Sequence, residues 1–217
     1  MKSSLRRFPT PSGAGRVHAD EPYGKGGGEL TSDVALDYGR DLILFEVVST
    51  RLPLGVRAVR DDSELASYLQ RTTLDKVKQL DRVVDDLLGG KAALDGVDMT
   101  HVERVWPVVV GIGEMVETEL LWDRVRQHIG GSLRQDVCEP LTLLGAQDAE
   151  VFAGMIAAGD DAIDLLREKQ STGYAKTGWV NWVTATRSPL PPRLPALQDR
   201  WNQLSQEAVG VLQLPAG

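Results

Sequence analysis

The chain has 217 residues, of which 42% are hydrophobic and 25% charged, a length and composition that suit one soluble domain with a buried core. Its net charge of −7 excludes a general polyanion binder, so any contact with nucleic acid requires a local basic patch or bridging metal ions. Cys138 is the only cysteine and no apolar run has the length of a membrane span, so we expect a cytoplasmic protein with no intrachain disulfide and no membrane partner.

The N-terminal residues predict a flexible tail, a short strand and a hairpin. Residues 1–15 are rich in Pro, Gly, Ser and Arg and predict a flexible tail. A short strand is predicted over residues 16–19, and residues 33–38 and 41–48 predict a hairpin with its turn at Gly39. The second hairpin strand is almost continuously apolar, which is typical of a central strand covered on both faces.

The strongest helical signal runs from residue 64 to residue 88, with a cap at residues 62–63 and an end at Gly89-Gly90. Apolar spacing places one stripe of this helix against the core. The stripe consists of Leu65, Leu69, Thr73, Leu80, Val84 and Leu87. Lys76 falls inside the stripe and Gln79 on its border, which makes an inward lysine beside a glutamine a candidate pair. The alternatives are that Lys76 is an edge residue whose ammonium group reaches solvent, and that Gln79 bonds only the backbone of the sheet.

The rest of the chain predicts two further buried strands and several helices. The strands are expected at residues 105–112, where Pro107 suggests a bulge or an edge region, and at residues 138–144. The helices are expected at residues 117–129, 147–158, 160–170, around Trp179 and Trp182, and at 196–212. We expect these two tryptophans to pack the helices together, with base stacking as the alternative. The order predicts an α/β fold with a mixed central sheet flanked by helices, made of a core at residues 16–145 and a C-terminal helical appendage at residues 146–217.

Two acids in the hairpin are the main candidates for chemistry. Asp33 opens the first strand and Glu46 lies late in the second, among apolar residues. A buried carboxylate is costly without a partner, and a divalent metal is a common one. A Mg²⁺ or Mn²⁺ site here would use Asp33, Glu46, the Val47 carbonyl and Glu21 as a fourth ligand.

The arrangement resembles the PD-(D/E)xK, or restriction-endonuclease-like, nuclease superfamily. Its core is a helix, three antiparallel strands, a helix and a strand, and residues 16–112 reproduce most of that order. This chain departs from the motif at Val48, where the superfamily has lysine. The resemblance implies a metal-dependent nuclease, acting on DNA rather than RNA, with Asp33 and Glu46 as catalytic metal ligands. It further implies that Lys76 replaces the lysine missing at Val48 and that Gln79 positions water or supports the ligands.

Several alternatives stay open at this point. Glu46 can form a structural ion pair with Arg51, Arg57 or Lys76, and Asp33 can bind backbone amides. The chain can also be a catalytically inactive nuclease-like fold that binds protein or nucleic acid, or part of a larger defence or DNA-processing protein. Its C-terminal helices are candidates for contact with a partner protein or a second copy.

Overall fold

The computed structural model describes most of the sheet and the helices on either side of it. The described residues are 13–19, 22–23, 29–49, 67–111, 133–134, 136–187, 189–191, 194–195 and 198–199. Several predicted features lie outside or mostly outside these ranges. They are the tail up to residue 12, the ligand Glu21, the helix cap at 62–63, Arg51 and Arg57, and the helices at 117–129 and 196–212.

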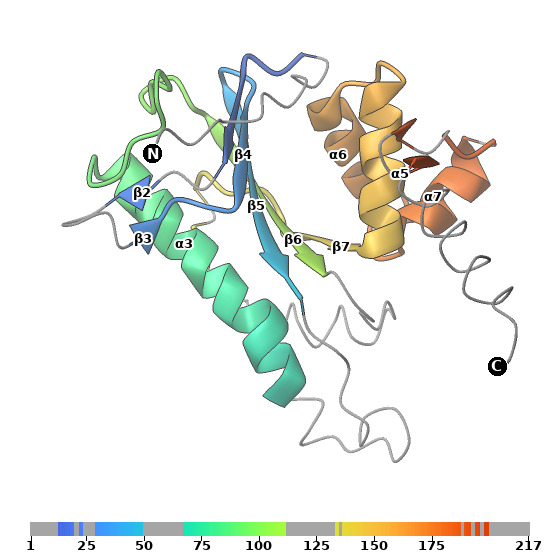
Figure 1. Ribbon diagram of the computed structural model, residues 1–217, viewed down its shortest axis with the longest axis horizontal. Coiled ribbons are helices and arrows are strands. Elements are labelled where there is room, and N and C mark those ends of the chain that lie inside the picture. The colour runs from blue at the N-terminus through green and yellow to red at the C-terminus, as the bar shows by residue number, and fades with distance from the viewer. Residues whose placement is uncertain are drawn as a thin grey trace, which may run out of the picture.

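A mixed five-stranded sheet, in the order β1-β4-β5-β6-β7, forms the centre of the fold (Figure 1). Its strands are β1 (Arg16–Ala19), β4 (Val34–Asp37), β5 (Asp41–Val48), β6 (Arg104–Gly111) and β7 (Thr142–Gly145). The first three pair antiparallel, whereas β6 and β7 run parallel to β5. Two shorter strands, β2 (Pro22–Tyr23) and β3 (Glu29–Leu30), pair separately. The expected hairpin and mixed sheet are therefore confirmed.

Alternation along β5 divides its side chains between two buried layers, as expected for a central strand. Leu42 and Leu44 belong to the cluster under α3 (Asp75–Leu88), and Ile43 belongs to the cluster under the C-terminal helices. All three side chains are 0% exposed. Each such burial contributes about 2 kcal/mol of hydrophobic free energy.

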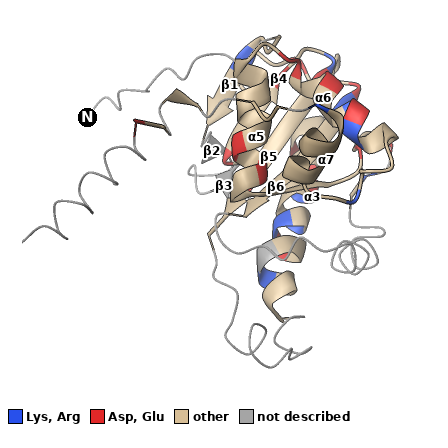
Figure 2. Cartoon of the chain, turned by 90° about the vertical axis from the view of Figure 1, so that its right-hand side faces the viewer, with Lys and Arg blue, Asp and Glu red and all other residues tan. Residues whose placement is uncertain are grey.

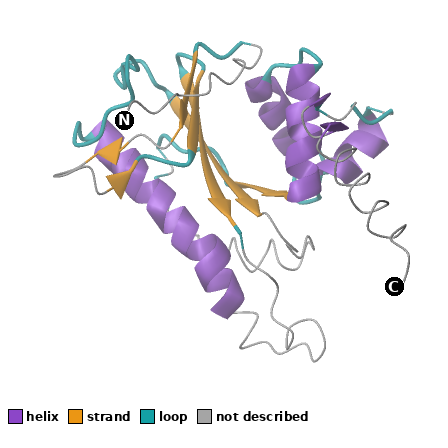
Figure 3. Cartoon of the chain, in the orientation of Figure 1, coloured by secondary structure: helices purple, strands orange, loops and turns teal. Residues whose placement is uncertain are grey.

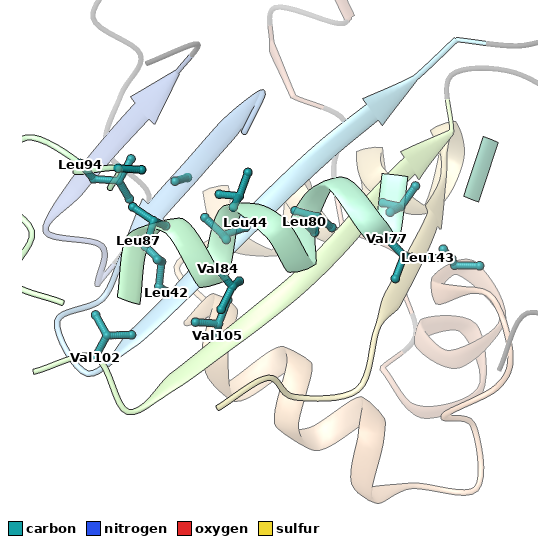
Figure 4. Close-up of a cluster of buried hydrophobic side chains, with 14 of the residues drawn as sticks. Leu42, Leu44, Val77, Leu80, Val84, Leu87, Leu94, Val102, Val105 and Leu143 are labelled. Atoms are coloured by element: carbon teal, nitrogen blue, oxygen red, sulfur yellow. The ribbon is translucent and has the colours of Figure 1, made fainter. Parts of the chain in front are cut away.

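Among the described helices, α3 covers one face of the sheet. Figure 4 shows Leu80, Val84 and Leu87 of α3 directed toward Leu42 and Leu44 of β5. The helix ends at Gly89, and Gly90 follows with a φ of 69°, which confirms the predicted stop. A π-helical turn, η1 (Gln70–Leu74), joins α3 to helical residues 67–69.

The opposite face is covered by α5 (Ala146–Ala157), α6 (Ala162–Ser171) and α7 (Trp179–Thr186) (Figure 3). Trp179 and Trp182 are 1% and 0% exposed and pack edge to face, with ring centroids 5.2 Å apart. Packing is therefore the role that the structure shows for both tryptophans. The helices that we expected as an appendage share one buried cluster with Ile43 of β5 and Trp106 of β6.

Among the described helices, none has both the length and the apolar character of a membrane span.

Pro107 lies in β6 where the pairing with β7 is interrupted. β6 forms an isolated bridge from Val105 to Cys138, and the β7 ladder begins only at Val108, opposite Thr142. Proline removes a backbone donor, so it fits a position between two stretches of pairing. The described part of the chain thus places Pro107 at a local edge, as its residue type predicts.

Candidate active site

Glu46 is the centre of a closed ring of hydrogen bonds between β5 and α3. Its side chain is 0% exposed. Lys76 donates from Nζ to Glu46 Oε2 over 2.7 Å, and Gln79 donates from Nε2 to Glu46 Oε1 over 2.8 Å. The ring closes because Lys76 Nζ also donates to Gln79 Oε1, at 3.1 Å. Both carboxylate oxygens therefore have a partner within one turn of α3.

The sequence places these three residues together through two periodicities. On β5, Glu46 shares the face of Leu42 and Leu44, which is the face that α3 covers. On α3, Lys76 and Gln79 are three residues apart and so lie on one side of the helix. Of the three cations considered as partners for Glu46, the structure shows Lys76; Arg51 and Arg57 lie outside the described residues.

Asp33 stands beside this ring, at the start of β4. Its Oδ2 accepts a hydrogen bond from the backbone N–H of Val47 over 2.6 Å. The β4–β5 register pairs Val34 with Phe45, so one further step places Asp33 opposite Glu46. The amide contact is the one that residue type alone suggested. It also holds the Asp33 carboxylate next to β5, where the second acid lies.

Burial dominates the electrostatics of Glu46. Loss of hydration raises the pKa of this carboxyl above its ordinary value, and the negative charge of Asp33 raises it further. The hydrogen bond and positive charge of Lys76 act in the opposite direction and lower the pKa without cancelling the effect of burial. A cation close to both acids is therefore what the ionised form of Glu46 requires.

Val48 is one more residue on the α3 face of β5. Its partly buried side chain packs against the cluster of Leu42 and Leu44. A lysine is therefore absent from this strand position, and the cation next to Glu46 comes from α3 instead. The Lys76 side chain is 24% exposed, so its ammonium group retains contact with solvent while it binds a fully buried acid.

The oxygen donors at this site suit a hard divalent cation. Asp33 and Glu46 supply carboxylates, and the Val47 carbonyl lies on the Asp33 side because a strand residue directs its N–H and C=O to the same edge. Such a set, completed by water, matches the preferences of Mg²⁺ and Mn²⁺. Within the described ranges no group of three or more His, Cys, Asp or Glu residues gathers, and the expected fourth ligand Glu21 lies outside them.

A second acid network lies at the opposite end of β5, and sequence reasoning missed it. Asp41 accepts from Trp106 Nε1 over 2.8 Å and forms ion pairs with Arg104 at 3.0 Å and Arg167 at 2.9 Å. The partners come from β6 and α6, so no sequence pattern near Asp41 predicts them. With three residues bound to one carboxylate, this network ties α6 to the sheet and supplies no free ligand.

Comparisons with known proteins found a likeness to a solved structure, with a low TM-score. No family model and no curated protein matches the sequence. Among solved structures, the chain is similar to the small subunit of a heterodimeric restriction endonuclease, with 13% identity, a TM-score of 0.38, and coverage of 80% of this chain and 81% of that one. The mixed five-stranded sheet with flanking helices is consistent with a restriction-endonuclease-like fold. A likeness at this level assigns no role to a residue.

Proposed function

We propose that this chain is a metal-dependent nuclease that hydrolyses the phosphodiester bonds of DNA. The observation that supports the proposal is the juxtaposition of Asp33 and Glu46 with Lys76, a cation supplied by the helix in place of the strand position at Val48. Two acids and one cation at the end of a central strand are the groups that metal-assisted phosphodiester hydrolysis uses.

Asp33, Glu46 and the Val47 carbonyl would hold Mg²⁺ or Mn²⁺. The bound ion would supply a more acidic water and charge stabilisation at the phosphate. Lys76 Nζ would then bind a phosphate oxygen or orient the attacking water, since it is the partly exposed member of the ring. Gln79 holds both neighbours: its Nε2 fixes Glu46, and its Oε1 aims Lys76.

The test is cleavage of supercoiled plasmid by purified protein, with Mg²⁺ or Mn²⁺ and with EDTA. We expect nicking or degradation only with metal. Asp33→Asn, Glu46→Gln and Lys76→Met should each lower the rate by at least about 100-fold, the lower range for a group that takes part in proton transfer or charge stabilisation.

Glu103→Gln is the matched control, because Glu103 is an exposed acid that pairs with Arg40 away from the ring. Its cleavage rate should equal that of the unsubstituted protein. Cleavage that persists at full rate in both Asp33→Asn and Glu46→Gln would remove the assignment, since it would come from another site or from a contaminant.

One observation favours a second candidate, a catalytically inactive nuclease-like fold that serves as a binding module. Glu46 is fully buried and its two oxygens are already held by Lys76 and Gln79, so the ring satisfies itself without a metal. Under this alternative, the ring is a structural ion pair that joins α3 to the sheet.

Calorimetric titration with Mn²⁺ separates the two candidates without a substrate. A metal site gives saturable heat that disappears in Asp33→Asn and remains in Glu103→Gln. A binding module without a metal site gives the same weak heat for all three proteins. The second result, together with absence of cleavage, would favour the inactive module.

A further inference from the structure

Three exposed cations on the helix that carries Lys76 have no polar partner among the described residues. They are Arg71 in η1 and Lys78 and Arg82 in α3. No hydrogen bond, ion pair or ring contact joins any of them to another part of the chain that the structure describes. We call these three residues the α3 strip.

The other arginines and lysines of the described ranges are engaged. Arg40 pairs with Glu103, and Arg187 pairs with Asp160 and Glu168. The remaining ones, each with a partner, are Arg16, Lys76, Lys91, Arg104, Arg134, Arg167, Lys169 and Lys176. In a protein with a net charge of −7, three cations without an ion pair on one helix set this surface apart from the rest of the described chain.

Among the described residues, the acids of the same helix form no ion pair with the strip, because each has another partner. Asp85 pairs with Arg134 at 3.3 Å, and Asp86 pairs with Lys91 at 3.4 Å. Asp75 accepts from Gln70 Nε2 at 2.7 Å, and Asp81 accepts from the Arg134 backbone N–H at 3.1 Å. Asp75 and Asp81 keep their negative charge, because the donors that they accept from are neutral. The strip is therefore a group of cations without ion pairs rather than a surface of unopposed positive charge.

The α3 strip lies on the same helix as the candidate active site. Lys78 lies between Lys76 and Gln79 in sequence, but it points to solvent while they point to Glu46. Arg82 is four residues beyond Lys78 and so lies on the same side of the helix. Figure 2 shows Lys and Arg on the part of α3 that projects past the sheet. The strip and the ring around Glu46 therefore share one helix, with Lys78 two residues from Lys76.

We infer that Arg71, Lys78 and Arg82 bind the phosphate backbone of duplex DNA and guide it to the ring. The inference rests on the proposed function, since it takes DNA as the substrate of that site. Guanidinium and ammonium groups are the usual ligands of phosphate oxygens, and exposed side chains bind them with little loss of hydration. A protein with a net charge of −7 needs local cations for such contacts, and the strip supplies three.

The test is the salt dependence of binding to a fluorescent DNA duplex, measured by anisotropy in EDTA, where no metal-dependent cleavage occurs. Arg71→Ala/Lys78→Ala removes two phosphate contacts, and each contact contributes about 0.9 to the slope of log affinity against log salt. We expect the slope to fall by about 1.8, with binding weakened at least about tenfold at 0.1 M salt. Lys78→Ala/Arg82→Ala should give a similar loss.

Arg40→Ala/Lys91→Ala is the matched control, because it removes the same charge from exposed positions that are paired with Glu103 and Asp86. Its slope should stay within error of the unsubstituted protein. An equal loss in the control, an unchanged slope in the strip variants, or no binding by the unsubstituted chain at low salt would each overturn the inference.

The outcome is separable from that of the proposed function. If plasmid cleavage is absent but the strip variants alone lose slope, the nuclease assignment fails and the DNA-binding strip stands. If Asp33→Asn abolishes metal-dependent cleavage but the strip variants bind and cleave as before, the nuclease assignment stands and the strip fails.

Discussion

At the scale of single residues, two buried carboxylates on β5 are stabilised in different ways. Asp41 is held by donors from β6 and α6, whereas Glu46 is held by two side chains of one helix. In each case charge-assisted hydrogen bonds offset the loss of hydration. Glu46 has a second acid, Asp33, beside it, which is why the candidate chemistry lies at that end of the strand.

The ion pair between Lys76 and Glu46 predicts a pH-dependent stability change. Lys76→Met should lower the free energy of unfolding by about 2 kcal/mol at pH 8, the value of a hydrogen bond to a charged group. Without the lysine, the pKa of Glu46 rises further above its unfolded value, so the folded state favours the protonated acid. The loss should therefore be small below the ordinary pKa of glutamate and grow as pH rises through the folded-state pKa.

Urea unfolding of the single variants and of Glu46→Gln/Lys76→Met, from pH 4 to pH 8, measures this coupling. The double variant should recover part of the stability that Lys76→Met loses, because it leaves no buried charge without a partner. Additive effects of the two substitutions, with no dependence on pH, would show that the pair carries no coupling energy.

At the scale of elements, helical spacing predicted α3 and its inward lysine but not the π-helical turn before it. The backbone N–H of Asp75 bonds to the carbonyl of Gln70, five residues back. Such a turn holds an additional residue, and so rotates the preceding helix by about 100° relative to an uninterrupted one. Tyr68 and Leu69, which precede the turn, are both buried, at 3% and 8% exposure.

The end of α3 supports a test at this scale. Gly90 has a φ of 69° and open space around the position of a Cβ atom, so only backbone conformation opposes a side chain. Gly90→Ala should therefore lower the free energy of unfolding by about 1 kcal/mol. Gly173→Ala is the control, since Gly173 has equal space without a positive φ and should be neutral. Equal effects of both substitutions in thermal unfolding would contradict this account of the helix end.

At the scale of the whole molecule, one sheet serves two cores. Leu44 and Ile43 are neighbours on β5, yet they belong to the clusters under α3 and under α5–α7. Neither layer can be removed without exposing one face of the same strands. The described helices after residue 145 therefore complete the sheet that positions Glu46.

Truncation after residue 145 tests this dependence. The shortened chain should fail to give a cooperative unfolding transition, and should bind an apolar dye, because it exposes the sheet residues of the second cluster. Those residues are Leu36, Ile43, Trp106, Val108 and Leu144. In the full chain, Ile43→Ala should cost about 2 to 5 kcal/mol and keep a single transition. A truncated chain that unfolds cooperatively would show that residues 16–145 fold as an independent core.

The sequence by itself determined the local features of this protein: the hairpin, the central character of β5, the end of the long helix, and the inward phase of Lys76. These follow from periodicity and turn chemistry, which act between near neighbours in the chain. Only the tertiary structure decided that Lys76 and Gln79 share Glu46, that Asp33 binds the Val47 amide, and that α5–α7 cover the second face. These contacts join residues far apart in the chain. Several side chains are chemically suitable partners for each acid, and the packing of the folded chain decides which of them makes the contact.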